Sequence, residues 1–263
     1  LAVATFTAAS AQGSAGSTII SDKFDEDFST NIADHTPNTD TVGTGWVVER
    51  GIWRVNDGSA REATNIYWRH ILDRRAVIDA GTADKSVEVE VKVDDFDVQF
   101  WGVVARQSGE LDWTMAFQDD IGDIVLGVKD ANEDQWGEPY SIYNPDAIPA
   151  GFQELGRVHH PMEKQRKSHK LKLVVNGDNI EVFADGQSVI TATDTNHAGG
   201  TNAGIFARGM DVQQFLKFTV TQGDTGGGGS KGGGGKGGPK GGSSSAPLLE
   251  PTPTPTPTPG EGD

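Results

Sequence analysis

The sequence contains no cysteine, and it has no apolar run of the roughly 20 residues that a membrane-spanning helix needs. Without cysteine there is no disulfide framework, no thiolate metal site and no cysteine nucleophile. Basic residues are few, with 22 Lys and Arg against 38 Asp and Glu. The resulting formal net charge of −16 disfavours partners such as nucleic acids and anionic lipids. Cations and neutral, hydroxyl-rich molecules remain compatible with this charge.

The sequence also lacks the hydrophobic period of an amphipathic helix over any three turns, and residues 19–222 instead have the pattern of short strands. Residues 86–93, SVEVEVKV, alternate valine with polar and charged residues. Residues 169–194 alternate in the same way through two tight turns. Strands without crossover helices predict antiparallel sheets. We therefore expect an all-β fold over 19–222, a two-sheet antiparallel jelly-roll β-sandwich.

The two ends of the chain differ in composition from this body. Residues 1–11 are small and apolar, and they end in Ala-Ser-Ala, a pattern that precedes a signal-peptidase cut. They predict the remnant of a secretory signal, with an Ala-rich arm or a first strand as the alternative. Residues 224–263 combine a Gly-rich stretch with a Thr-Pro repeat, which predicts a disordered tail. Such a tail tethers a domain to a further module or a surface, so we expect a secreted or cell-surface protein.

The order of the strand motifs is similar to that of a known superfamily. The motifs are FDEDFST at 24–30, the strand at 86–93, FWGVVARQSGELDWTMAFQ at 100–118, LKLVVNGDNIEVFADGQSVI at 171–190 and AGIFARGMDVQQFLKFTV at 203–220. This ordered set, over roughly residues 20–220, resembles the concanavalin A-like lectin/glucanase superfamily. Within it, laminin-G-like modules and glycoside-hydrolase-like domains of bacterial secreted proteins are most similar. The resemblance implies two curved sheets with a concave ligand-binding face.

Calcium is the one cofactor that the sequence suggests. The resemblance implies an ion between an N-terminal acidic segment and an Asp of the last strand. Asp22, Asp25 and Asp27 match the first half of that site, but the last strand has no Asp. A second candidate comes from the residues alone, because Asp119, Asp120 and Asp123 are spaced to hold calcium from a bent loop. A simple acidic hairpin tip is the alternative for this second group.

A strand of the form Glu-x-Asp-x-Glu carries catalysis in glucanases of the superfamily, since period 2 places the nucleophile and the general acid on one face. The nearest match is Glu88 and Glu90, with Lys92 at the third acidic position and Asp94 one step further on the same face. We interpret this departure as evidence against retaining glucanase chemistry and expect a solvated sheet face instead. A glycoside hydrolase that uses Glu88, Glu90 and Asp94 is kept as an alternative function.

Sugar recognition combines aromatic ring faces with amides and carboxylates that bind hydroxyls. One segment supplies this mixture on an expected rim loop: Trp136, Tyr140, Tyr143, Asn132, Asp134 and Asn144. A second group is Trp101, Arg106 and Trp113, whose tryptophans are equally compatible with a buried core. We predict a non-catalytic carbohydrate-binding module whose partner is a polysaccharide or cell-surface glycan. A structural surface or filament subunit that assembles through its N-terminal arm is a further alternative.

Overall fold

The computed structural model describes residues 16–63, 74–93, 100–109, 112–119, 121–130, 152–160, 167–208 and 213–223. The chain divides into two units, Leu1–Gly227 and Gly228–Asp263, and all described residues belong to the first. They form strands and one short 3-10 helix, η1 (Ile32–Asp34). No helix in these ranges is long and apolar enough to cross a membrane.

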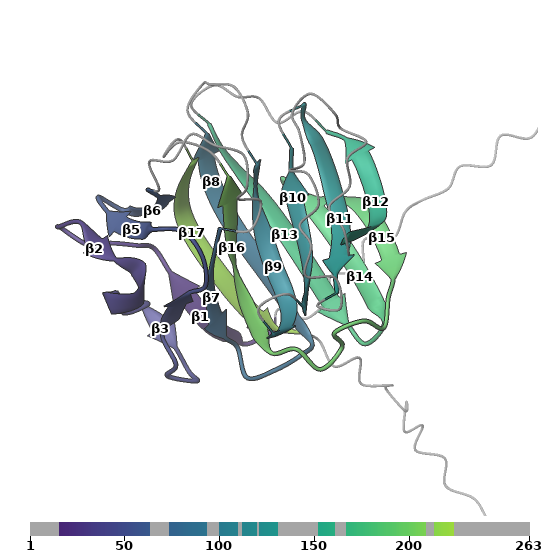
Figure 1. Ribbon diagram of the computed structural model, residues 1–263, viewed down its shortest axis with the longest axis horizontal. Helices are drawn as coiled ribbons and strands as arrows, with labels where there is room; N and C mark the ends of the chain where they lie inside the picture. Colours follow the sequence, from purple (N-terminus) through teal and green to yellow (C-terminus); the bar gives the residue numbers. More distant parts are fainter. Residues whose placement is uncertain are drawn as a thin grey trace, which may run out of the picture. The chain divides into compact units, whose positions relative to one another are not determined.

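The strands form two antiparallel sheets, which we name sheet A and sheet B. Sheet A has the order β15 (Gln187–Thr193), β14 (Asn179–Ala184), β13 (Ser168–Asn176), β8 (Lys85–Val93), β17 (Gln213–Gln222), β6 (Ser59–Glu62), β5 (Trp53–Asn56) and β2 (Thr30–Asn31). In the same sheet β1 (Thr18–Asp22) pairs with β17 and with β3 (Thr39–Asp40). Figure 1 shows β2, β5 and β6 at one side of the domain, with β12 and β15 at the other.

Sheet B has the order β12 (Phe152–His159), β11 (Asp123–Lys129), β10 (Asp112–Gln118), β9 (Phe100–Gly109), β16 (Asn202–Arg208), β7 (Arg75–Asp79) and β4 (Trp46–Val48). All strand pairs within both sheets are antiparallel. The expected all-β fold with two antiparallel sheets is therefore confirmed.

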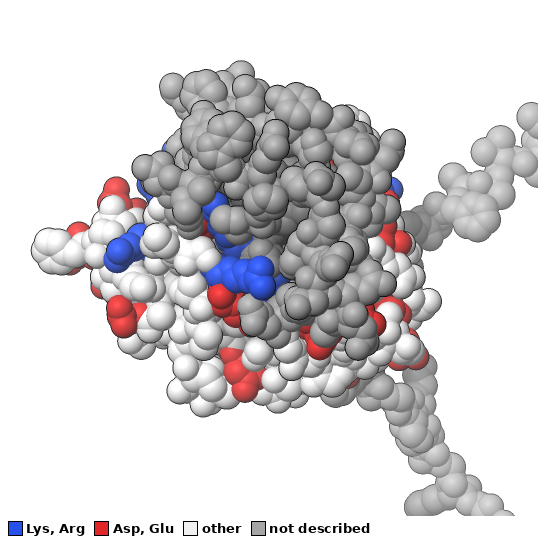
Figure 2. Space-filling view, in the orientation of Figure 1, with Lys and Arg blue, Asp and Glu red and all other residues white. Residues whose placement is uncertain are grey.

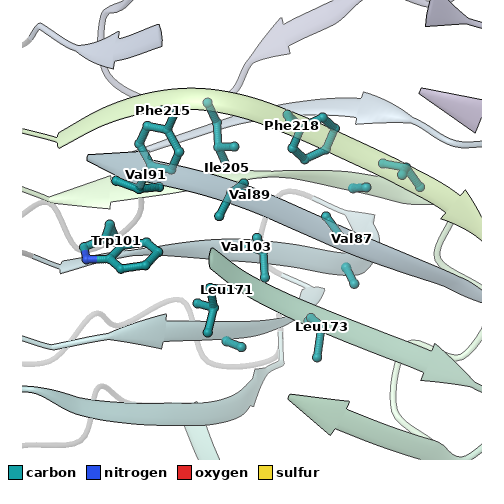
Figure 3. Close-up of a cluster of buried hydrophobic side chains, with 14 of the residues drawn as sticks. Val87, Val89, Val91, Trp101, Val103, Leu171, Leu173, Ile205, Phe215 and Phe218 are labelled. Atoms are coloured by element: carbon teal, nitrogen blue, oxygen red, sulfur yellow. The ribbon is translucent and has the colours of Figure 1, made fainter. Parts of the chain in front are cut away.

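The core between the sheets is built from the alternation that the sequence shows. Val89 of β8 lies opposite Leu171 of β13 and Phe218 of β17, and all three side chains are fully buried. Trp101, Val103 and Ile205 of sheet B belong to the same cluster (Figure 3). Each such side chain contributes about 1.5–3 kcal/mol when it leaves water. Burial of one face of each strand thus holds the two sheets together.

The structure also has tight turns at the Asp-Gly pairs of the sequence. Asp185 and Gly186 connect β14 to β15 with φ of 46° and 83°. Positive φ at both central residues is the requirement of a type I′ hairpin turn, and glycine adopts it without strain. Asp57 and Gly58 connect β5 to β6 in the same way, with φ of 51° and 70°. These turns set the register that places alternate residues in the core.

Candidate functional site

The outer face of sheet A is a mixed ladder of charges, and we name it the charged face: Glu88, Glu90, Lys92, Lys170, Lys172 and Lys217. Glu88 lies opposite Lys172, and Glu90 lies between Lys170 and Lys217. Lys170 Nζ is 4.0 Å from Glu88 Oε1, and the Ser168 hydroxyl donates to Glu90. The side chain of Glu88 is 35% exposed. The acid pair of the hydrolase alternative therefore belongs to a solvated face, and its third member, Asp94, lies outside the described residues.

The outer face of sheet B is apolar, and we name it the aromatic face: Phe100, Val104, Trp113, Met115, Phe117, Val125 and Phe206, with Phe152 packed against them. Phe117 lies at its centre, with ring centroids of Phe100, Phe152 and Phe206 at 6.0, 6.2 and 5.9 Å. The seven cluster residues are at most 6% exposed. β9, β10 and β11 are thus buried on both faces.

Four residues at one end of the aromatic face form a polar group, which we name the Trp113 site: Glu49, Arg75, Gln107 and Trp113. The guanidinium carbon of Arg75 lies 5.2 Å from the centroid of the Trp113 ring, a cation–π distance. Arg75 Nε donates to Glu49 Oε2 at 3.0 Å, and Gln107 Nε2 donates to Glu49 Oε1. The carboxylate of Glu49 therefore joins an amide to a guanidinium, and the guanidinium lies over the indole of Trp113.

A bulge in β9 brings Gln107 to this site. The pairing of β9 shifts register against both β10 and β16, and Arg106 has a φ of 50°. A bulge adds one residue to a strand and redirects the side chains that follow it. Gln107 then lies opposite Asn202 and bonds to Glu49. Arg106 instead donates to the carbonyl oxygens of Asp194, at 3.2 Å, and Gly177.

Trp113 and Gln107 each have a buried atom without a hydrogen-bond partner among the residues that the structure describes: the donor Trp113 Nε1 and the acceptor Gln107 Oε1. Leaving a buried polar group unsatisfied costs about 1–3 kcal/mol. Such exceptions are few in native proteins and call for an explanation. A hydroxyl group both donates and accepts, so a hydroxyl-bearing ligand can satisfy either kind of atom.

The second predicted ligand group does not converge. Trp101 lies in the core between the sheets, where its Nε1 donates to Gln118 Oε1 at 3.0 Å. Arg106 binds backbone carbonyls, and only Trp113 lies on the aromatic face. Alternation along β9 separates Trp101 from that face, and the bulge turns Arg106 away. The structure therefore does not bring Trp101 and Arg106 together with Trp113 on one face.

The first predicted ligand group, Trp136, Tyr140, Tyr143, Asn132, Asp134 and Asn144, lies outside the described residues. The residues that sequence analysis missed are Glu49, Arg75 and Gln107. They come from three strands or strand ends far apart in sequence, and no local spacing marks them. The aromatic face did leave a signal, because the continuous apolar runs of β9 and β11 are typical of strands buried on both faces.

The first predicted calcium ligand, Asp22, has a protein partner instead. Its fully buried carboxylate accepts hydrogen bonds from Trp46 Nε1 at 2.8 Å and Phe24 N at 2.9 Å, and it lies 2.9 Å from His35 Nε2. His35 Nδ1 lies 2.8 Å from Glu26 Oε1. Burial alone would lower the pKa of His35, but the hydrogen bonds with Asp22 and Glu26 raise it. An imidazolium donates from both nitrogens, so His35 neutralises Asp22.

The second acidic group also surrounds a side-chain cation. Arg157 Nη1 donates to Asp119 Oδ2 at 2.9 Å and to Asp123 Oδ2 at 3.1 Å, and His159 Nδ1 lies 2.8 Å from Asp123 Oδ1. Burial raises the pKa of Asp119. Burial acts in the same direction on Asp123, but hydrogen bonds from His159 and Arg157 hold its pKa below the usual value. This is an ion-paired hairpin tip, the alternative that the sequence left open.

The remaining calcium candidates add no ligands. Asp25 accepts from the Asn38 amide at 3.0 Å, and Asp120 lies outside the described residues. Within the described ranges, no group of three or more His, Asp or Glu side chains is arranged to hold a metal ion. The geometry thus gives the calcium expectation no support.

Both signs of charge occur on the surface that Figure 2 shows. Lys and Arg side chains gather near its middle, with Asp and Glu beside them and around the margin. Among the described residues of this view, acidic side chains therefore interrupt the basic ones.

No protein-family model and no curated protein matches the sequence. Among solved structures, a carbohydrate binding module from Bacillus subtilis is similar at 14% identity and a TM-score of 0.44, over 68% of this chain and 93% of that one. The galectin LEC-6 of Caenorhabditis elegans is similar at 16% identity and 0.40, over 59% and 95%. LamAcat from Zobellia galactanivorans is similar at 12% identity and 0.46, over 78% and 97%. At these values no residue role transfers to this chain.

Proposed function

We propose that this chain is a non-catalytic carbohydrate-binding module and that the Trp113 site contributes its polar contacts. The observation that carries the proposal is the pair of buried atoms Trp113 Nε1 and Gln107 Oε1, neither of which has a hydrogen-bond partner among the described residues, with Arg75 stacked on the Trp113 indole. Sugar sites use an aromatic surface for the ring and a few placed polar groups for the hydroxyls. The net charge of −16 favours a neutral sugar over a polyanion.

Binding without hydrolysis is favoured by where the candidate acids lie. Glu88 and Glu90 are on sheet A, whereas the Trp113 site is on the outer face of sheet B. Lysines lie opposite both glutamates. A retaining glycosidase instead needs two carboxyl groups about 5–5.5 Å apart around the scissile bond, one of them held protonated. The charged face offers no aromatic platform comparable to that of the other sheet.

The proposal extends to the two ends of the chain. Their composition supports a module that is secreted or held at a cell surface, with residues 224–263 as the tether. Mass spectrometry of the mature protein tests this part. Loss of residues 1–11 supports export, and a mature protein that keeps them contradicts it.

A glycan array with three proteins tests binding at the Trp113 site. Gln107→Leu removes the amide at nearly constant volume, and Glu88→Gln is the matched control on the charged face. We expect the wild type and Glu88→Gln to bind the same glycans, and Gln107→Leu to bind them at least about tenfold more weakly, or about 1.4 kcal/mol.

Thermal unfolding of each variant separates loss of binding from loss of folding. An array without any bound glycan contradicts the carbohydrate assignment. Unchanged binding by a folded Gln107→Leu contradicts the site. Sugar release that disappears in Glu90→Gln would replace binding by catalysis.

A further inference from the structure

The edges of the two sheets differ in length and charge. Sheet A ends at β15 and β2, and sheet B ends at β12 and β4. Strands β2 and β4 have two and three residues, too short to pair well with another chain. β12 has eight residues, but it carries Glu154 and Arg157, which ion-pair at 2.9 Å. Charged side chains on an edge discourage further pairing.

β15 is the long edge without a charged residue. Its seven residues, QSVITAT, contain Val, Ile and two Thr, which favour strands. Among the described strands it pairs only with β14. A bulge between Val182 and Phe183 disturbs the start of this pairing, but Ile190 to Thr193 stay in regular register. The outward N–H and C=O groups of that segment form a template for another strand.

We propose that β15 pairs with the β15 strand of a second copy of this chain, so that sheet A continues across a two-fold axis. Two-fold dimers are the commonest homo-oligomers, and their interface uses the same patch on both copies. Each copy carries a net charge of −16, so contact through charged surface repels. An uncharged strand keeps like charges out of the contact itself, so only the long-range repulsion between the net charges remains.

The pleat fixes which residue lies on the axis. In an antiparallel pair, directly opposite residues point to the same side of the sheet. A two-fold axis perpendicular to the sheet must therefore pass midway between the two copies of one residue, which is paired with its own symmetry mate. The regular segment centres on Thr191 and Ala192. With Thr191 on the axis, the two Thr191 side chains face each other on the solvent side, and Ile190 faces Ala192 of the second copy on the core side.

Sedimentation equilibrium of the full chain tests this interface. One strand pair buries little area, so we expect a weak dimer that grows with concentration from the 27.9 kDa monomer. Thr191→Lys places two like charges directly opposite each other and should raise the dimer dissociation constant at least about tenfold. Thr191→Val keeps the branched shape and should leave dimerisation intact. Gln153→Lys, the same kind of change on the exposed part of β12, should also have no effect.

Two further readouts keep the test independent of any one variant. Salt at about 0.5 M should strengthen the wild-type dimer, because it screens the net charge of both copies. Hydrogen exchange should slow at the amides of 187–193 as the protein concentration rises. A monomer at every concentration up to about 1 mM contradicts the proposal. So does a dimer that a folded Thr191→Lys leaves unchanged. Glycan binding at the Trp113 site is expected to survive Thr191→Lys, so the two proposals fail separately.

Discussion

The charged face and the aromatic face come from the same strand alternation but surround their polar groups differently. On the charged face, Glu88 and Glu90 lie among lysines in solvent, where ion pairs contribute little. On the aromatic face, Glu49 and Arg75 pair beside Trp113 with little exposure to water. Polar contacts strengthen when water is excluded, so the same residue types should contribute more to stability on the aromatic face than on the charged face.

The largest expected effect is a loss of stability when the packing of the aromatic face is disrupted. Phe117→Ala removes the central ring of the aromatic face and should lower the free energy of unfolding by about 3–5 kcal/mol. On the charged face, Lys172→Ala removes a cation–π contact of 4.1 Å to Phe183 and should cost at most about 1 kcal/mol. Urea unfolding measures both. A cost below about 1 kcal/mol for Phe117→Ala would show that the aromatic face is not packed.

The next largest effect concerns the buried carboxylate of Asp22, in β1 of sheet A. His35→Ala leaves the charge of Asp22 uncompensated and should cost about 3 kcal/mol or more at pH 6. The pKa of His35 is raised above 6.5, so its contribution is complete below pH 6.5 and is lost as the pH rises through the folded value.

The stability difference between wild type and His35→Ala should therefore shrink at alkaline pH. The measurement uses the difference in stability between the two proteins at each pH, because Lys85 titrates in both and its contribution cancels. Burial and the neighbouring Arg106 lower the pKa of Lys85 to about 7. A difference that stays constant from pH 6 to pH 9 would contradict the ionised pair.

A smaller effect compares the ion pairs at the tip of the β10–β11 hairpin with those of the charged face. Arg157→Gln should cost about 1–2 kcal/mol at pH 7, because Asp119 and Asp123 lose a charge-assisted hydrogen bond. The pKa of Asp123 is held below its ordinary 3.8, so its contribution is present above that pH and is lost as the pH falls through the folded value.

Lys170→Gln, which removes the 4.0 Å contact with Glu88, should change the stability by at most about 0.5 kcal/mol. Urea unfolding at pH 7 and pH 3 measures both variants. Equal costs for the two substitutions would contradict the stronger pairing expected at the partly buried hairpin tip.

For the last variant we expect almost no change in the free energy of unfolding. Glu88→Gln should leave the free energy of unfolding within about 0.5 kcal/mol of the wild type, because Glu88 is partly exposed and its ion pair is long. Denaturant unfolding checks the stability, and a sugar-release assay checks the chemistry. A loss of sugar release in this variant would restore a catalytic role to the charged face.

Sequence alone could predict the layers of this fold but only part of its site. The alternation of Val87, Val89 and Val91 fixed one face of β8, and the Asp-Gly turn fixed the β14–β15 hairpin. Both are local signals, and the structure has both. The partners of Asp22 and Trp113 are not local. His35 reaches Asp22 across 13 positions, and Arg75 reaches Trp113 across three strand pairings.

Trp101 and Trp113 illustrate the same limit of prediction from sequence. Both are tryptophans in apolar strands, and composition does not say which sheet face each one takes. The register between β9 and β10 decides, and a bulge at Arg106 alters it. Bulges depend on tertiary packing, so the sequence does not indicate where the face changes.

The most direct test of the central claim is an NMR titration of the indole N–H signals of the six tryptophans with a glycan identified on the array. Trp113 Nε1 has no hydrogen-bond partner among the described residues, so a bound hydroxyl should shift its resonance, while that of Trp101, bonded to Gln118, stays in place. A bound glycan that leaves the Trp113 signal unmoved would contradict binding at this site.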